Sequence, residues 1–199
     1  MFAGLKIKIR HKHGKKAANR NEETMTAVLG GRLRLVSDCA GLADEIAAIV
    51  EPAFKAKYGS GSGEVKIIAD LRAQGDALVE LAALLDGEVA GYAMFSRLGV
   101  DPADRKIAAL APVAAKIGLQ KSGVGSALIA EGHAQLRSLG YQAVAVLGDP
   151  AYYGRFGYSA ALGRKLTSPF AGSHFQALEL KPGALDGGSW AVRYPRAFD

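Results

Sequence analysis

The sequence has little of what disulfide-rich, metal-binding and membrane proteins need. It contains one cysteine, Cys39, and four histidines in 199 residues. This excludes a disulfide framework within the chain and leaves the histidines without partner thiols at metal-ligand spacing. No stretch approaches the roughly 20 apolar residues of a membrane-spanning helix, and the N-terminus lacks the continuous apolar segment of a secretory signal. We therefore expect a cytoplasmic protein of one domain, with no metal site and no membrane partner.

Positive charge is concentrated at one end of the chain. The net charge is +6, but residues 1–24 hold seven Lys or Arg and two Glu, which leaves a net charge of +1 for the rest. A basic segment of this kind can bind polyanions, so nucleic acid is an expected partner only through residues 1–24. The period-two alternation of apolar and basic residues at 5–10 disfavours the amphipathic helix of a transit peptide. We expect a disordered extension over residues 1–31, or a translation start at Met25.

Strand and helix signals alternate from residue 32 onward, which is typical of an α/β domain. Asp38 is expected to cap a helix over residues 39–54, and Asp86-Gly87 between two apolar runs predicts a β-hairpin. An amphipathic helix is expected to end at Gly140. Its apolar face is predicted to hold Gly125, Leu128, Ile129, Gly132, Leu136 and Leu139. The other expected elements are helices at 64–75 and 150–157 and strands at 32–37, 77–85, 89–98, 106–115, 141–148, 158–166, 174–181 and 190–198.

The stretch "QKSGVG" at residues 120–125 lies between an expected strand and an expected helix. Glycines at a helix N-terminus leave several backbone N–H groups free, and the helix dipole makes them a site for an anion. A Walker loop would need its lysine after the glycines, whereas Lys121 precedes Gly123. A dinucleotide fingerprint would need glycine or alanine where Leu128 stands. An anion site and an ordinary tight turn remain open from these residues alone.

The combination of a strand, "QKSGVG", an amphipathic helix, a buried strand and "YYGRFGY" resembles the Gcn5-related N-acetyltransferase (GNAT) superfamily. The resemblance spans residues 32–181, and the closing "RYPRAF" is also similar to a bacterial branch of predicted acetyltransferases. It implies an α/β (α+β) fold with a mixed central sheet of six to seven strands flanked by helices. The sheet would splay between its fourth and fifth strands, 106–115 and 141–148. Two departures are Ile117 near the place of a common proline and Tyr158 in place of phenylalanine.

The resemblance implies acetyl-CoA as co-substrate and assigns residues to it. The loop would hold the pyrophosphate, and the end of the preceding strand would pair with the pantetheine arm. The implied cofactor-binding residues are Val113, Ala114, Ala115, Gln120, Lys121, Ser122, Gly123, Val124, Gly125 and Ser126. Pro112 fits either a broken strand ladder at this point or a bulge without function.

The resemblance also implies the catalytic groups. Tyr153, four residues before Gly157, would be the general acid for the leaving thiolate, and the backbone N–H of Ala114 would hold the oxyanion. Glu80 and His174 are alternative candidates for the general base. Cys39 on an alanine-rich helix is expected to be packing, so an acetyl-cysteine intermediate is not expected.

The function expected from the resemblance is acetyl-CoA-dependent transfer of an acetyl group to a primary amine of a small molecule or peptide, an acyltransferase reaction. The alternatives are an acyl-CoA-binding regulatory module without acceptor chemistry and a ribosome- or RNA-associated acetylase that uses the basic segment. The expected division is an extension at 1–31, an N-acetyltransferase domain at 32–181 and a C-terminal strand or clasp at 182–199. The last segment offers an edge for a homodimer, so a monomer and a homodimer are both open.

Overall fold

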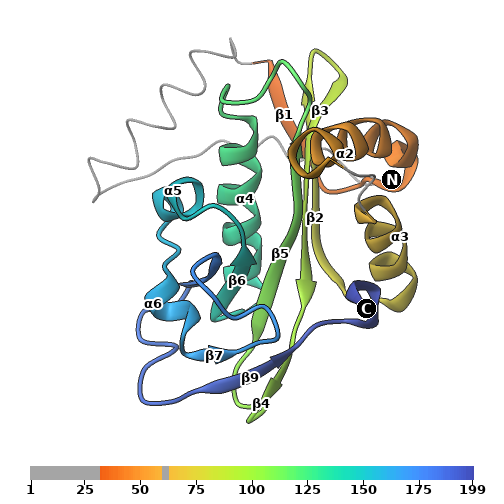
Figure 1. Ribbon diagram of the computed structural model, residues 1–199. Coiled ribbons are helices and arrows are strands. Elements are labelled where there is room, and N and C mark those ends of the chain that lie inside the picture. The colour runs from red at the N-terminus through yellow and green to blue at the C-terminus, as the bar shows by residue number, and fades with distance from the viewer. Residues whose placement is uncertain (1–31, 60–62) are drawn as a thin grey trace.

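The computed structural model describes residues 32–59 and 63–199 (Figure 1). The predictions for residues 1–31, and so for a nucleic-acid partner of residues 1–24, lie outside the described residues. The stretch "GSGSG" at residues 59–63 is also expected to be a flexible hinge, and most of it lies outside the described residues. Within the described part of the chain, none of the helices combines the length and the apolarity needed to cross a membrane.

A six-stranded mixed sheet forms the centre of the fold, in the order β1-β2-β3-β5-β6-β8. Its strands are β1 (Leu33–Val36), β2 (Ala77–Leu85), β3 (Glu88–Arg97), β5 (Ile107–Ala115), β6 (Ala143–Leu147) and β8 (Phe175–Glu179). All neighbours pair antiparallel except β5 and β6, which pair parallel. The predicted hairpin is confirmed: β2 and β3 are joined by Asp86 and Gly87, with φ of 53° and 92°. Both residues have the positive φ that a tight hairpin turn requires.

A second sheet of three strands lies beside the first, in the order β4-β9-β7. It consists of β4 (Gly99–Asp101), β9 (Trp190–Arg193) and β7 (Leu166–Thr167). The possibility that residues 190–198 form an edge strand is wrong, because β9 pairs with β4 on one side and with β7 on the other. β9 is therefore the middle strand of this second sheet.

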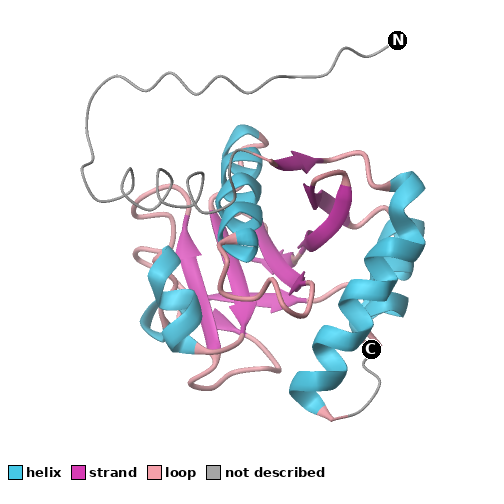
Figure 2. Ribbon diagram, turned by 90° about the horizontal axis from the view of Figure 1, so that it is seen from above, coloured by secondary structure: helices cyan, strands magenta, loops and turns pink. Residues whose placement is uncertain are grey.

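Helices cover both faces of the main sheet (Figure 2). On one face lie the 3₁₀ turn η1 (Ala40–Leu42), α2 (Ala43–Tyr58) and α3 (Glu64–Gln74), and on the other lie α4 (Val124–Ser138) and α5 (Pro150–Tyr153). Short turns η2 (Gly154–Phe156) and η3 (Arg196–Phe198) follow α5 and β9. The expected cap at Asp38 is wrong for α2, because Asp38 Oδ1 accepts from the Ala40 N–H (3.4 Å) in the 3₁₀ turn, and α2 begins only at Ala43.

The strand predicted at residues 158–166 is also wrong over most of its length. Ser159 makes a single bridge to β8, and its Oγ accepts from the N–H of Leu162 (3.2 Å). This hydrogen bond caps a short helix, α6 (Ala160–Gly163). Only Leu166, at the end of the predicted segment, joins a strand, β7.

The apolar face of α4 packs on the sheet as predicted at Leu128, Ile129, Gly132 and Leu136, with three differences. Gly125 lines the cleft instead, and a Cβ there would lie 2.7 Å from the Tyr152 hydroxyl oxygen. Gly132 allows the close approach, because a Cβ there would lie 2.0 Å from Cε2 of Phe95 on β3. Leu139 was expected on this face but is 50% exposed, since it lies at the C-cap beyond the last helical residue. His133 is buried on the face instead, and the periodicity of apolar residues alone did not indicate it.

Candidate active site

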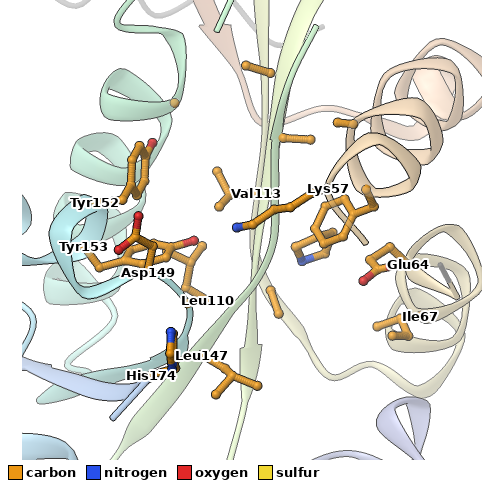
Figure 3. Close-up of a pocket in the computed structure, with 18 of the residues that line it drawn as sticks. Lys57, Glu64, Ile67, Leu110, Val113, Leu147, Asp149, Tyr152, Tyr153 and His174 are labelled. Atoms are coloured by element: carbon orange, nitrogen blue, oxygen red, sulfur yellow. The ribbon is translucent and has the colours of Figure 1, made fainter. Parts of the chain in front are cut away.

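The central feature of the site is the separation of β5 from β6. The two strands pair only from Ile107 opposite Ala143 to Ala109 opposite Ala145. Beyond Ala109, β5 remains paired with β3 on its other side, up to Ala115 opposite Gly91. Residues 110–115 therefore have one free strand edge, and a cleft of about 980 Å³ opens along it (Figure 3). The predicted splay between these strands is confirmed.

Pro112 lies in the part of β5 that borders the cleft. The pairing of β3 with β5 shifts register between Ala93 and Phe95, which face Val113 and Leu110. A proline donates no hydrogen bond to a neighbouring strand, so an irregular ladder is the expected place for it. The structure thus shows a bulge at Pro112 and, beside it, the broken ladder between β5 and β6.

The glycine loop reaches the same cleft from the N-terminus of α4. Lys121 and Gly123 have φ of 63° and 98°, which turns the chain sharply before the helix. Among the described residues, no backbone acceptor meets the N–H groups of residues 123–126. Free N–H groups at the start of a helix of 15 residues form a site for an anion. This geometry favours the anion site over a plain turn.

The predicted cofactor residues do not all face the cleft. Those that line it are Val113, Ala114, Ala115, Gln120, Lys121 and Gly125. Ser122 uses its hydroxyl within the loop, since Oγ donates to the carbonyl of Leu119 (2.6 Å). The side chain of Val124 is fully buried against Gly91. Gly123 and Val124 are left with their backbone N–H groups as their means of contact with an anion, and Ser126 is not among the residues that line the cleft.

Tyr153 lines the cleft from the wall opposite α2 and α3 (Figure 3). It ends α5, which begins with Pro150 and is capped by Asp149, whose Oδ1 accepts from the Ala151 N–H (2.9 Å). Tyr153 is 8% exposed, and its ring packs edge-on against Tyr152 at a centroid distance of 5.0 Å. The short helix and its cap thus hold a phenol in a largely dry wall of the cleft.

An uncharged layer lies behind Tyr153. The ring of Tyr158 is 5.8 Å from that of Tyr153, and the Tyr158 hydroxyl lies 2.8 Å from Nε2 of His133. Burial lowers the pKa of His133 to about 4, and burial raises the pKa of Tyr158 well above its ordinary value. Both groups are therefore neutral near pH 7, and the wall behind Tyr153 carries no ionised group from this pair.

The two candidates for the general base lie in different surroundings. His174 lines the cleft on the same wall as Asp149, and its Nδ1 is 3.2 Å from Oγ of Ser173 (Figure 3). Glu80 is not among the residues that line the cleft. Its carboxylate accepts from Nε of Arg72 (3.0 Å) and from the Tyr92 hydroxyl (2.9 Å). The structure therefore brings His174, and not Glu80, to the other candidate residues.

Cys39 lies in the apolar layer beneath α2 and is 3% exposed. Burial, reinforced by the nearby Glu80, raises the pKa of its thiol to about 12. A buried thiol that stays protonated is a poor nucleophile. This agrees with the expectation that Cys39 is a packing residue.

No sequence motif indicates the wall formed by α2, α3 and the C-terminal segment. Lys57, Glu64 and Ile67 lie there on the opposite side of the cleft from Tyr153 (Figure 3). The aromatic residues that also line the cleft are Phe54, Tyr152, Phe170, Tyr194 and Phe198. These residues come from segments far apart in the chain, so no local spacing could have revealed the wall.

Within the described residues, no group of three or more His, Cys, Asp or Glu could hold a metal ion.

A mixed sheet that splays at one parallel pair, with a glycine loop at the opening, is the architecture that the resemblance to CoA-dependent acetyltransferases implied. The model of the acetyltransferase (GNAT) family matches residues 43–158. The chain is 37% identical over 139 residues to the uncharacterized N-acetyltransferase YhbS of Escherichia coli K12, which covers 68% of this chain and 83% of that protein. This chain therefore belongs to the GNAT family of acetyltransferases.

Solved structures with the same fold contain the co-substrate. YhbS from Escherichia coli in complex with CoA matches with a TM-score of 0.72 and 33% identity, over 83% of this chain and 90% of that chain. A GNAT family acetyltransferase from Brucella melitensis in complex with acetyl-CoA matches with a TM-score of 0.70 and 32% identity, over 84% of this chain and 98% of that chain. The fold class and the acyltransferase class predicted from the sequence are confirmed.

Proposed function

We propose that this chain transfers the acetyl group of acetyl-CoA to a primary amine of a small molecule or peptide, by direct attack within a ternary complex. The observation that supports this most is the meeting of three features in one cleft: the free edge of β5, the N-terminus of α4 and the side chain of Tyr153. The complexes of the two relatives with CoA and acetyl-CoA support acetyl-CoA as the co-substrate.

Acetyl-CoA would bind through the backbone of two elements. The free N–H groups at the start of α4, with Lys121 and Gln120 beside them, would hold the pyrophosphate. The free edge of β5 at Val113–Ala115 would pair with the amides of the pantetheine arm, as an added strand does. The thioester would then lie along the free edge of β5, where a backbone N–H that faces the cleft would stabilise the oxyanion. The N–H of the expected donor, Ala114, does not face it: Ala114 is opposite Tyr92 of β3, and two residues on the Lys116 N–H donates to the Ala90 carbonyl of β3, so the Ala114 N–H also points toward β3.

The reaction needs proton transfers at both sulfur and nitrogen. The amine nitrogen forms a bond to the thioester carbonyl carbon, the C–S bond breaks, and its electron pair leaves on sulfur. Tyr153 would donate its hydroxyl proton to that sulfur, which gives free CoA thiol. An amine of pKa about 10.4 arrives protonated at pH 7, so its nitrogen must lose two protons: one would pass to the Tyr153 oxygen as the amide forms and restore its hydroxyl, and the other must leave before the attack. His174, which lines the cleft, would accept it directly or through water.

A thiol-release assay with acetyl-CoA tests the proposal. The amines would be grouped as polyamines, aminoglycosides, amino acids, lysine peptides and arylalkylamines, and products would be identified by mass spectrometry. We expect amine-dependent release of CoA thiol together with an acetylated amine. Binding of CoA in a calorimeter without thiol release from any group would instead identify an acyl-CoA-binding module.

A further inference from the structure

An aromatic wall borders the cleft on the side away from the glycine loop. Phe170 packs edge-on against Tyr194 at 4.9 Å between ring centroids, and Tyr194 packs on Phe198 at 5.2 Å. All three rings line the cleft, and Phe54 of α2 lines it as well. Edge-on pairs of this kind give a rigid apolar surface that suits an apolar or aromatic body of a ligand.

One carboxylate on this side has no partner of its own. Glu64 is the first residue of α3 and lines the cleft. Its Oε2 is buried and has no hydrogen-bond partner among the described residues. Figure 3 shows the carboxylate turned from α3 toward the cleft. A buried acceptor left without a donor costs about 1–3 kcal/mol, so a ligand that supplies a donor gains binding energy at this point.

The other charged groups of the cleft are placed differently. Asp149 lies on the opposite wall and already accepts from the Ala151 N–H. Lys57 extends toward Val113 of β5, nearer to the expected path of pantetheine than Glu64 is (Figure 3). On the wall that carries the aromatic rings, Glu64 is therefore the carboxylate available to a cationic group of the acceptor.

We propose that the acceptor is a primary amine on an apolar or aromatic body, and that Glu64 receives its ammonium group as the acceptor enters. The inference rests on the proposed acetyl transfer and narrows its substrate class. The aromatic wall packs on the body of the acceptor, and Glu64 accepts hydrogen bonds from its nitrogen. A polyamine would bring further cations and an aminoglycoside many hydroxyls, and this apolar wall offers neither of them a matched set of partners.

Initial rates with the full chain test the inference. We expect kcat/KM for 2-phenylethylamine to exceed that for spermidine, an aminoglycoside and a lysine peptide by at least about tenfold. In Glu64→Gln, the KM for 2-phenylethylamine should rise about 10- to 100-fold, because the ammonium then bonds to a neutral amide oxygen and loses its counter-charge. The Kd of acetyl-CoA, measured by calorimetry, should stay the same. Glu51→Gln on the exposed side of α2 is the matched control and should leave KM unchanged.

The outcomes separate this inference from the proposed function. Efficient acetylation of the polar amines, or an unchanged KM in Glu64→Gln, would overturn the inference and leave acetyl transfer intact. Acetyl-CoA binding with no turnover of any amine would overturn both. Thermal unfolding of Glu64→Gln at or above the wild-type temperature would show that a raised KM reflects recognition and not misfolding.

Discussion

The ring of Tyr153 lies directly against the backbone of Gly148. A Cβ built at position 148 would be 2.2 Å from Cε2 of Tyr153, far inside van der Waals contact. Gly148 directly follows β6, its N–H donates to the His174 carbonyl (2.9 Å), and it lines the cleft together with Tyr153. The Tyr153 ring can therefore occupy its position only because Gly148 has no Cβ.

We expect Gly148→Ala to move the Tyr153 ring and to lower kcat at least about tenfold, since a displacement of about 1 Å can cost 100-fold in a positioned reaction. The matched control is Gly154→Ala, because a Cβ there meets nothing within 4 Å and the φ of −55° suits alanine. Steady-state kinetics at saturating acetyl-CoA measures both variants. Equal kcat in Gly148→Ala and Gly154→Ala would show that the position of Tyr153 does not matter.

The buried His133 makes stability depend on pH. Its pKa is about 4 in the folded chain, because burial opposes the charged form, against 6.5 for a free histidine. Below pH 6.5 His133 is protonated in the unfolded chain but stays neutral in the folded chain. The free energy of unfolding therefore decreases as the pH falls from 6.5 to about 4. The loss is on the order of 3 kcal/mol, and above pH 6.5 this contribution is constant.

The variant His133→Gln isolates this effect, because glutamine can bond to the Tyr158 hydroxyl but does not titrate. Urea unfolding at several pH values should show a weaker fall in stability for the variant than for the wild type between pH 6.5 and 4. Carboxylates that titrate in the same range affect both proteins alike. Parallel curves for the two proteins would mean that His133 is protonated as easily in the folded chain as in water.

Glu80 is expected to stabilise the fold and not to take part in catalysis. Its carboxylate binds Arg72 and Tyr92, and its side chain is 17% exposed, against 29% for Arg72. Glu80→Gln should lower the free energy of unfolding by about 1–3 kcal/mol, because it leaves Arg72 without its counter-charge. The kcat of the folded variant should stay within about twofold of wild type.

Asp70→Asn breaks the exposed ion pair with Lys66 on the same helix and is the control, with an expected change below about 0.5 kcal/mol. Denaturant unfolding and a pH–rate profile measure the two effects. If Glu80→Gln instead lost the acid limb of the profile along with 100-fold in kcat, Glu80 would be the general base.

The cofactor side of the site could be predicted because its signals are local. A strand, two glycines and an apolar period of 3.6 residues follow one another within residues 106–139. Residues 160–163 form a helix where the sequence predicts a strand, because the apolar run there is too short to distinguish a helical period of 3.6 from a strand period of 2. The hydrogen bond of Ser159 to the N–H of Leu162 decides for the helix.

The first two helices and the loop at 167–174 are the segments expected to border the acceptor, but its individual residues could not be predicted, because distant segments without a motif form this side. Three rings of this side come from segments far apart in the chain: Phe54 from α2, Phe170 from the segment before β8, and Phe198 from η3 after β9. The sequence pattern also could not show that Glu80 is unsuited to act as the general base. Strand alternation places it on one face of β2, but only the packing of α3 shows that Arg72 already holds it.

The turnover of Tyr153→Phe at saturating acetyl-CoA and amine tests most directly whether this cleft performs acetyl transfer. We expect kcat to fall about 10²- to 10⁴-fold while the Kd of acetyl-CoA changes little, because only the proton donor to the departing sulfur is lost. Tyr141→Phe, which lies outside the cleft, should keep wild-type turnover. Undiminished turnover in Tyr153→Phe would contradict the role of Tyr153 and the chemistry assigned to the cleft.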